Sequence, residues 1–156
     1  MSDDRHWLRR AIALAADGSG RGEGGPFGAV IVRGHVAIGE GWNRVLARPD
    51  PTAHAEIEAI RAAAETIGDH RLEGAVAYSS SEPCPMCLAA LHWARVERIV
   101  FAAGRDVAAA IGFDDARLYA DLQAPHEVSI PISQMLADEA EVVMTAWGRT
   151  PGRRLY

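Results

Sequence analysis

Cysteine is scarce in this sequence of 156 residues, which contains only Cys84 and Cys87. Two cysteines cannot build the dense disulfide framework that stabilises many small secreted domains. The N-terminal residues 1–4 are acidic and lack the charged-then-apolar order of a signal peptide. We therefore expect a cytoplasmic protein in which both thiols are reduced.

Long apolar runs and an excess of positive charge are also missing. No stretch approaches the roughly 20 consecutive apolar residues that a membrane-spanning helix needs, so no membrane partner is expected. The formal net charge is −5, whereas a polyanion such as tRNA or DNA normally selects a basic surface. The glycine-rich segment 17–25 lacks the G-x-x-x-x-G-K-[ST] pattern of a phosphate-binding loop. A small or neutral ligand therefore fits the sequence better than a nucleic acid.

Length and composition predict one domain, residues 1–156, with its own hydrophobic core. Short apolar runs bounded by turn residues alternate with helical patterns of ten or more residues. This alternation predicts an α/β fold whose sheet, mixed or parallel, is covered by helices on both faces. The expected strands span 27–32, 36–42, 75–79, 99–103 and 127–132, with a hairpin turn at 33–35. A first helix is expected to begin after Ser2. Four more are expected at about 53–67, 84–94, 116–122 and 135–147.

The two cysteines form a C-x-x-C pair, a pattern found both in thiol-redox proteins and in metal sites. With no further cysteine, a metal site here needs ligands from histidine or carboxylate side chains. The histidine candidates are His6, His35, His54, His70, His92 and His126. His54 differs from the others, because His54-x-Glu56 followed by Pro83-Cys84-x-x-Cys87 matches the zinc-deaminase signature H-x-E…P-C-x-x-C.

The chemistry of these residues agrees with that signature. Cys84 and Cys87 are three residues apart at the start of an expected helix, where they share one face and where thiolates are favoured. His54 supplies a third ligand and leaves one tetrahedral position for water, whose pKa zinc can lower to about 7. Glu56 does not share the helix face of His54 and is placed to transfer protons. The alternative is a solvated redox pair beside ordinary helix-start residues, and Glu56 and the paired prolines favour the zinc interpretation.

Along nearly its whole length the chain resembles the cytidine-deaminase superfamily and, within it, the bacterial guanine deaminases. The resemblance implies a three-layer α-β-α sandwich with a central mixed five-stranded sheet, a Zn²⁺ cofactor and a homodimer. It also implies hydrolysis of guanine to xanthine and ammonia, and the Gly-Phe-Asp-Asp segment is the part specific to the guanine branch. The segments that carry the likeness are 24–32, 50–57, 82–88, 93–95 and 111–115.

The same resemblance suggests which residues contact a purine. Asp115 would bind the N1 and N2 edge of guanine, whose N–H donors suit a carboxylate, and would assist proton transfer. Asp114 is a second candidate, although it also suits a helix cap. Asn43 resembles the family's substrate-binding amide, with a turn asparagine as the alternative. Phe27 either stacks on the purine or belongs to the core, and His92 could line the pocket.

The C-terminal tail, about residues 148–156, is expected to cover the active site. Relatives end in an aromatic residue that closes over the site, in some cases from the partner subunit after tail exchange. Tyr156 resembles that residue, and a frayed terminus is the alternative. The ending Arg154-Leu155-Tyr156 is more similar to plant guanosine deaminases, so the free base and the nucleoside both stay open as substrates.

Three further alternatives remain at this point. One is a deaminase of another amino-heterocycle, such as ammeline or a pterin. Another is a tRNA adenosine deaminase, which shares the segment 50–56 but usually has a basic surface and tail. The last, from a different class, is a non-catalytic zinc or thiol-redox protein.

Overall fold

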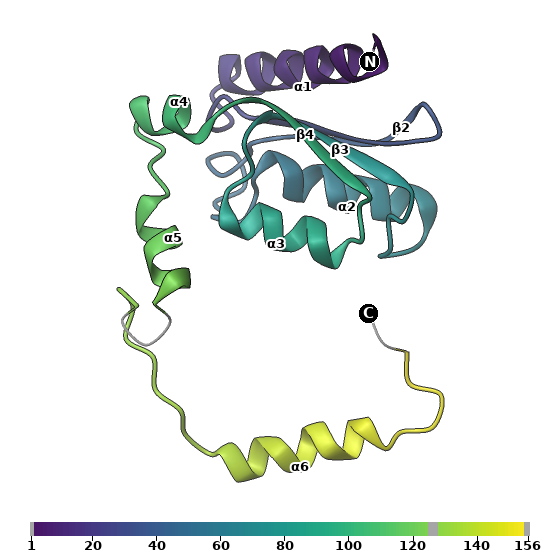
Figure 1. The fold of residues 1–156 in the computed structure, drawn as a ribbon, viewed down its shortest axis with the longest axis vertical. Helices are drawn as coiled ribbons and strands as arrows, with labels where there is room; N and C mark the ends of the chain where they lie inside the picture. The colour runs from purple at the N-terminus through teal and green to yellow at the C-terminus, as the bar shows by residue number, and fades with distance from the viewer. Residues whose placement is uncertain (1, 125–127, 155–156) are drawn as a thin grey trace. The chain divides into compact units, whose positions relative to one another are not determined.

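A four-stranded mixed sheet forms the middle layer of the first part of the chain, up to Asp115 (Figure 1). Its strands are β1 (Gly28–Arg33), β2 (Val36–Trp42), β3 (Ala75–Ser81) and β4 (Arg98–Ala103), arranged in the order β2-β1-β3-β4. β1 pairs antiparallel with β2 and β3, and β3 pairs parallel with β4. The computed structural model describes residues 2–124 and 128–154. These residues divide into two compact units, with the boundary between Asp115 and Ala116.

The first two strands form the predicted hairpin. Gly34 and His35 both have positive φ angles, 57° and 67°, which is the backbone of the tight turn that best fits the twist of two antiparallel strands. β2, which follows the turn, is less buried than β1, in which every residue from Gly28 to Val32 is buried. β1 is therefore the inner strand and β2 an edge of the sheet.

Helices cover both faces of the sheet, as the sequence predicted (Figure 1). Side chains of β1 alternate between the two faces. Val30 and Val32 pack against α1 (Ser2–Gly20), and Ile31 packs on the opposite side with α2 (Ala55–Ile67). The same opposite face also receives α3, whose bounds are Pro85–Trp93.

Gly41 allows the start of α2 to lie directly on β2. A Cβ atom at this position would fall on the backbone carbonyl of Ala55, so only glycine permits the contact. His54 is the residue immediately before α2, and its position is therefore set by the close packing of this helix on the sheet.

A polar cluster joins α1 to β3 and β4. The Tyr78 hydroxyl donates to Asp4 Oδ1 at 2.7 Å, and Arg98 Nη2 donates to the same carboxylate at 2.8 Å. These bonds, with Arg98 first, lower the pKa of Asp4 to about 2. Burial and the bond to Asp4 raise the pKa of Tyr78 to about 12. The cluster thus keeps Asp4 charged and Tyr78 neutral over a wide pH range.

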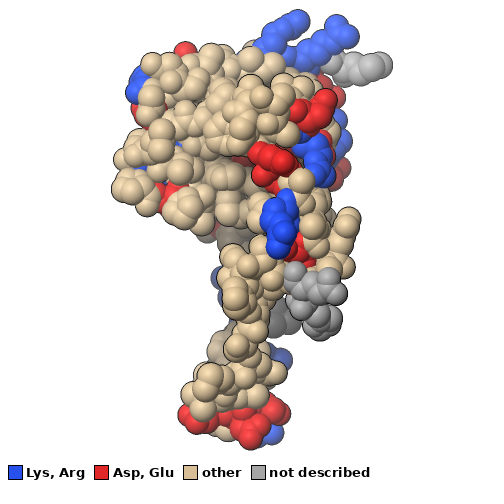
Figure 2. Space-filling model, turned by 90° about the vertical axis from the view of Figure 1, so that its left-hand side faces the viewer, with Lys and Arg blue, Asp and Glu red and all other residues tan. Residues whose placement is uncertain are grey.

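The remaining helices are α4 (Arg105–Ala110), which the sequence did not predict, α5 (Ala116–Gln123) and α6 (Ala137–Gly148). α5 and α6 belong to the second unit, and neither contains a buried residue. No helix among the described residues is long and apolar enough to cross a membrane. On the face drawn in Figure 2, arginine side chains lie among acidic ones, and most of that face carries neither charge.

The prediction of a five-stranded sheet was wrong, since the described residues form four strands. The expected fifth strand, 127–132, begins at Glu127, which lies outside the described residues, and residues 128–132 form no strand. Pro131 has no N–H to donate to a strand ladder. The N–H and hydroxyl of Ser129 both donate to the carboxylate of Asp121 in α5. This segment therefore bonds back to its own preceding helix.

Candidate metal and active site

His54, Cys84 and Cys87 come together in the structure. Each sulfur lies 3.6 Å from Nδ1 of His54, and all three ligand atoms lie within 4.8 Å of one another. An imidazole nitrogen and two thiols are donors that zinc binds in tetrahedral sites, so this set fits a zinc ion. Among the described residues, no other His, Cys or carboxylate belongs to the group. Three protein donors leave one tetrahedral position for water or substrate.

The starts of two helices position these ligands. His54 has an extended backbone (φ −72°, ψ 157°) and precedes α2, and Cys84 has a similar one (φ −64°, ψ 167°) and precedes α3. Pro85 begins α3, where its missing N–H costs no helical hydrogen bond, and Cys87 follows in the first turn. Because a helix N-terminus carries partial positive charge, this placement favours the thiolate forms that a metal binds.

The three groups share protons, and their pKa shifts follow from this. The pKa of Cys84 is lowered to about 4, chiefly because the Cys87 thiol donates a hydrogen bond to its sulfur. The same donation, burial and the charge of Glu56 raise the pKa of Cys87. The pKa of His54 is raised because its ring bonds to the Cys84 sulfur. A metal ion that binds both sulfurs would displace the proton held between them.

Glu56 lies beside the ligand group in the first turn of α2. Its side chain is 6% exposed, and its Oε1 accepts a hydrogen bond from Ser79 Oγ at 2.8 Å. Its carboxylate is also close enough to Cys87 to raise the pKa of that thiol by charge and by hydrogen bonding. Glu56 therefore lies next to the group of His54, Cys84 and Cys87 without belonging to it.

Asn43 follows β2 and is buried. Its side-chain oxygen accepts hydrogen bonds from the backbone N–H groups of Gly25 at 3.3 Å and Val45 at 3.2 Å. With the oxygen engaged, the side-chain NH₂ group is the part that can donate to a ligand. The N–H of the next residue, Arg44, donates to the carbonyl of Ala53 at 2.9 Å, which ties this segment to the residue before His54.

Phe27 contacts the Gly-Phe-Asp-Asp segment. Its ring meets that of Phe113 edge to face, with centroids 4.9 Å apart and an angle of 90°. Phe27 also packs against the core, so the structure supports the core interpretation. Asp115 forms an ion pair with Arg105 at 3.4 Å. The N–H of Arg105, the first residue of α4, donates to Glu82 at 3.1 Å, two residues before Cys84.

Three predicted substrate residues are not brought to the ligand group by any described contact. Asp114 is exposed beside Asp115, and His92 is exposed in the last turn of α3. Tyr156 lies outside the described residues.

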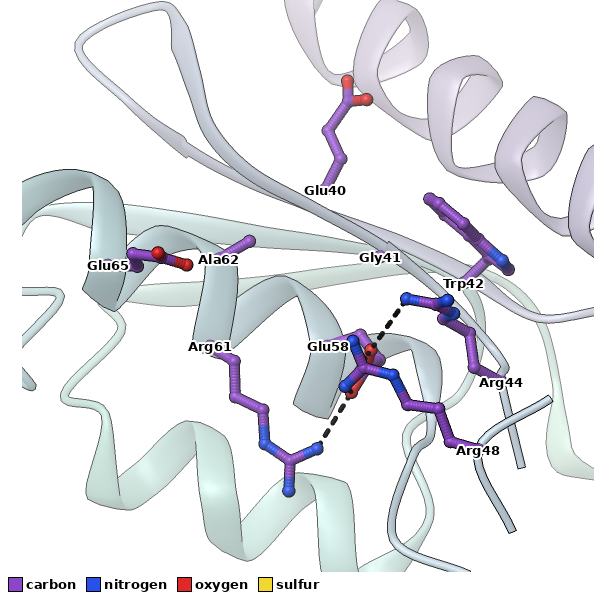
Figure 3. A pocket seen from close by; sticks show the side chains of 9 residues that line it. All are labelled: Glu40, Gly41, Trp42, Arg44, Arg48, Glu58, Arg61, Ala62 and Glu65. Atoms are coloured by element: carbon purple, nitrogen blue, oxygen red, sulfur yellow. Dashed lines mark hydrogen bonds and ion pairs between the residues drawn. The ribbon is translucent and has the colours of Figure 1, made fainter. Parts of the chain in front are cut away.

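A second polar site lies near the segment that follows Asn43 (Figure 3). It is an open cavity of about 290 Å³ whose walls include Trp42 and Arg44 but none of the three metal ligands. Arg61, Arg48 and Arg44 surround the buried carboxylate of Glu58 at 2.9, 3.2 and 3.9 Å. We interpret this cluster as structural, because it ties the segment 44–48 to α2 and its charges are paired.

Sequence reasoning missed Ser79, Gly24 and Arg105. Ser79 belongs to a run of three serines at the end of β3, directly before the Glu-Pro-Cys motif. Small polar residues at the buried end of a strand next to a metal motif were a usable signal. The contribution of Gly24 is steric, since a Cβ atom there would fall on the side-chain oxygen of Asn43. Arg105 carried no signal, because only the folded chain brings it to Asp115.

Comparison with known proteins gives consistent results. Residues 1–103 match the model of the cytidine and deoxycytidylate deaminase zinc-binding region. The chain is 43% identical over 151 residues to the guanine deaminase of Bacillus subtilis, covering 96% of this chain and 97% of that protein. It is 41% identical over 121 residues to the tRNA-specific adenosine deaminase of Haemophilus influenzae, covering 74% of this chain and 69% of that protein.

The fold agrees with these sequence similarities. The X-ray structure of the Bacillus subtilis guanine deaminase superposes with a TM-score of 0.94 at 42% identity, covering 97% of this chain and 98% of that one. Because the match includes almost all of both chains, the similarity is not limited to the metal-binding region.

Proposed function

The chain belongs to the family of the cytidine and deoxycytidylate deaminases, and we propose that it catalyses the zinc-dependent hydrolysis of guanine to xanthine and ammonia. Guanine is supported as the substrate by the extent of the similarity to the guanine deaminase. This similarity continues far beyond residue 103, where the match to the family model ends. It includes the segment 112–115, whereas the similarity to the tRNA deaminase covers less of the chain.

His54, Cys84 and Cys87 hold the zinc ion through one nitrogen and two sulfurs. When bound, zinc supplies the Lewis acidity that makes a water molecule nucleophilic near neutral pH. The three ligands come from two helix starts that pack on one face of the sheet, so the substrate carbon must be presented to that face.

Glu56 transfers the protons of the reaction. Its carboxylate accepts a proton as water adds to the carbon that carries the amino group. It returns this proton to a ring nitrogen, then takes the remaining proton of the added hydroxyl group as the carbonyl forms and gives it to the amine, which leaves as ammonia. Its position beside Cys87, with one oxygen held by Ser79, supports this role.

Asn43 and Asp115 select the purine. The NH₂ group of Asn43 donates to an acceptor on the ring, because its oxygen is engaged by the backbone. Asp115 accepts from the N1 and N2 edge and assists proton transfer, and Arg105 holds its carboxylate in place. Phe27 stacks on the purine ring.

The remaining predicted contacts complete the proposed pocket. Asp114 is a second acidic group beside Asp115, and His92 lines the pocket from the end of α3. Tyr156, at the end of the tail 148–156, closes over the substrate. These assignments rest on the family resemblance.

We further propose that residues 1–156 act as one deaminase domain in a cytoplasmic homodimer, with exchange of the C-terminal tail between subunits. The second unit supports this assembly, because α6 exposes Val142, Met144 and Trp147 to the extent of 69%, 73% and 48%. Large apolar side chains that are exposed together indicate an interaction surface. A second copy of the chain is the partner that we propose.

The test is ammonia release from a panel of guanine, guanosine, adenine, cytosine and ammeline by the zinc-loaded protein. We expect the highest kcat/KM with guanine and a product with the ultraviolet spectrum of xanthine. A higher kcat/KM with guanosine would show that the nucleoside is the substrate. Activity on none of the compounds would overturn the proposal. A gel shift with tRNA at physiological salt tests the alternative of a tRNA deaminase. We expect this protein not to bind tRNA.

A further inference from the structure

The hydroxyl of Ser79 points at the carboxylate of Glu56. Ser79 Oγ donates to Oε1 at 2.8 Å, and the two side chains are 2% and 6% exposed. They belong to different elements, β3 and α2, so the bond exists only in the folded chain. A bond from a buried hydroxyl to a carboxylate is stronger and shorter than one between neutral groups.

We propose that Ser79 is the positioning residue for proton transfer in this enzyme. It fixes Oε1 of Glu56 and thereby leaves Oε2 as the oxygen that meets the reacting atoms. This inference rests on the proposed function, because it assigns to Ser79 the orientation of the group that moves protons there.

The surroundings of Glu56 explain why such a restraint is needed. The carboxylate lies beside Cys87, one of the metal ligands, and interacts with its thiol. Zinc also binds carboxylate oxygens. Without the hydroxyl, Oε1 would be a buried acceptor that has lost its partner, which is costly. The carboxylate would then gain by turning, and a turn toward Cys87 would bring it to the group that would hold zinc.

Ser80, the next residue, provides the matched control. Its hydroxyl is also buried and also makes one hydrogen bond, but it accepts from the N–H of Gly28 at 2.9 Å. Replacing either serine by alanine removes one hydroxyl from the same end of β3. Only the replacement of Ser79 removes a contact to Glu56.

The kinetic experiment compares Ser79→Ala, Ser79→Thr and Ser80→Ala with the wild type. Misplacing a reacting group by about 1 Å can cost about 100-fold, and we expect Ser79→Ala to lose about 10–100-fold in kcat with little change in KM. Ser79→Thr keeps the hydroxyl and should recover most of kcat. Ser80→Ala should keep kcat even if it lowers Tm. Retention of kcat by Ser79→Ala, or equal losses in the two alanine variants, would overturn the proposal.

A second measurement tests the contact without any activity. Tm is measured for zinc-loaded Ser79→Ala, Glu56→Ala and the double variant. If the two side chains are bonded, the Tm loss caused by Ser79→Ala should be much smaller when Glu56 is already absent. Additive Tm shifts would show that the bond is not made. This cycle works even if the wild type deaminates nothing in the panel, so failure of the function and failure of this inference are distinguishable.

Discussion

His54 and Glu56 are only two residues apart, and on a helix that spacing turns their side chains in different directions. His54 joins the two sulfurs, whereas Glu56 lies against Ser79. A ligand and a proton-transferring group can thus occupy one helix start without competing for the same metal position.

Replacing Glu56 by glutamine tests this division of roles. Glutamine has nearly the same shape and still offers an oxygen to Ser79, but it cannot accept a proton. Because general acid–base groups contribute about 10²–10⁴-fold to rate, we expect kcat to fall in that range. Zinc content, measured by metal analysis, should stay at the wild-type value. A wild-type rate would contradict the role of Glu56, and loss of zinc along with activity would indicate that it is a ligand.

Gly24 sets the position of the Asn43 amide. Because a Cβ atom at residue 24 would fall on the side-chain oxygen of Asn43, Gly24→Ala should displace the amide. Misplacement of a binding group by about 1 Å can cost about 100-fold, and we expect a loss of this size in kcat/KM for guanine. Gly20→Ala is the control, since nothing lies within 4 Å of a Cβ atom there. Equal kcat/KM in both variants would show that Asn43 does not contribute to substrate selection.

Single residues were predictable from the sequence where the local chain determines them. The match to the zinc-deaminase signature grouped His54 with Cys84 and Cys87, and the three-residue spacing of the cysteines at a helix start placed both sulfurs on one face. The run of serines signalled the end of a strand near the site, but the contact of Ser79 with Glu56 was not predictable, since it spans 23 residues and depends on how α2 packs on β3. The same holds for the pair of Arg105 and Asp115.

At the scale of elements, the start of α2 is held from two sides. Gly41 allows it to lie on β2, and Glu58, one turn after His54, holds arginines from the preceding segment (Figure 3). Glu58 is 8% exposed, while Arg48 and Arg61 are about half exposed, at 46% and 50%. The carboxylate is therefore the buried partner, and its loss leaves several cations without their counter-charge.

Replacing Glu58 by alanine should destabilise the fold. Hydrogen bonds to charged groups are worth about 1.5–3 kcal/mol, and the half-exposed arginines recover some hydration, so we expect a loss of about 1–3 kcal/mol. Urea unfolding measures the free energy of unfolding directly. Glu65→Ala is the control, because Glu65 lies on the same helix and lines the same cavity but is exposed. Equal effects of the two substitutions would refute a specific role for the buried carboxylate.

Periodicity predicted most elements within one or two residues, and the exceptions have physical reasons. The apolar pattern identified β1, β2 and α2 because each buries one face or both. α4 was missed because it has six residues and buries none of them. The expected fifth strand failed because an apolar run containing Pro131 resembles a strand in composition but cannot supply the full ladder of hydrogen bonds.

At the scale of the whole molecule, a zinc ion held by His54, Cys84 and Cys87 would connect parts of the chain that are distant in sequence. His54 and Cys87 are 33 residues apart, and between them lie all of α2 and β3. Zinc bound to both would therefore link the starts of two helices that the sheet already holds together. The metal should then stabilise the fold as well as enable the reaction, because it binds the folded chain better than the unfolded one.

Removal of zinc tests this linkage. Free zinc at about 100 times its dissociation constant adds about 2.7 kcal/mol to the stability of a protein with one site, so a chelator should lower Tm by several degrees. The chelator should also abolish ammonia release from guanine, and added zinc should restore both properties. Cys87→Ser, which lacks one ligand, is the matched control, and its Tm should respond much less to the chelator. If Tm and turnover of the wild type are both unchanged after complete removal of zinc, confirmed by metal analysis, the three residues do not form a functional metal site.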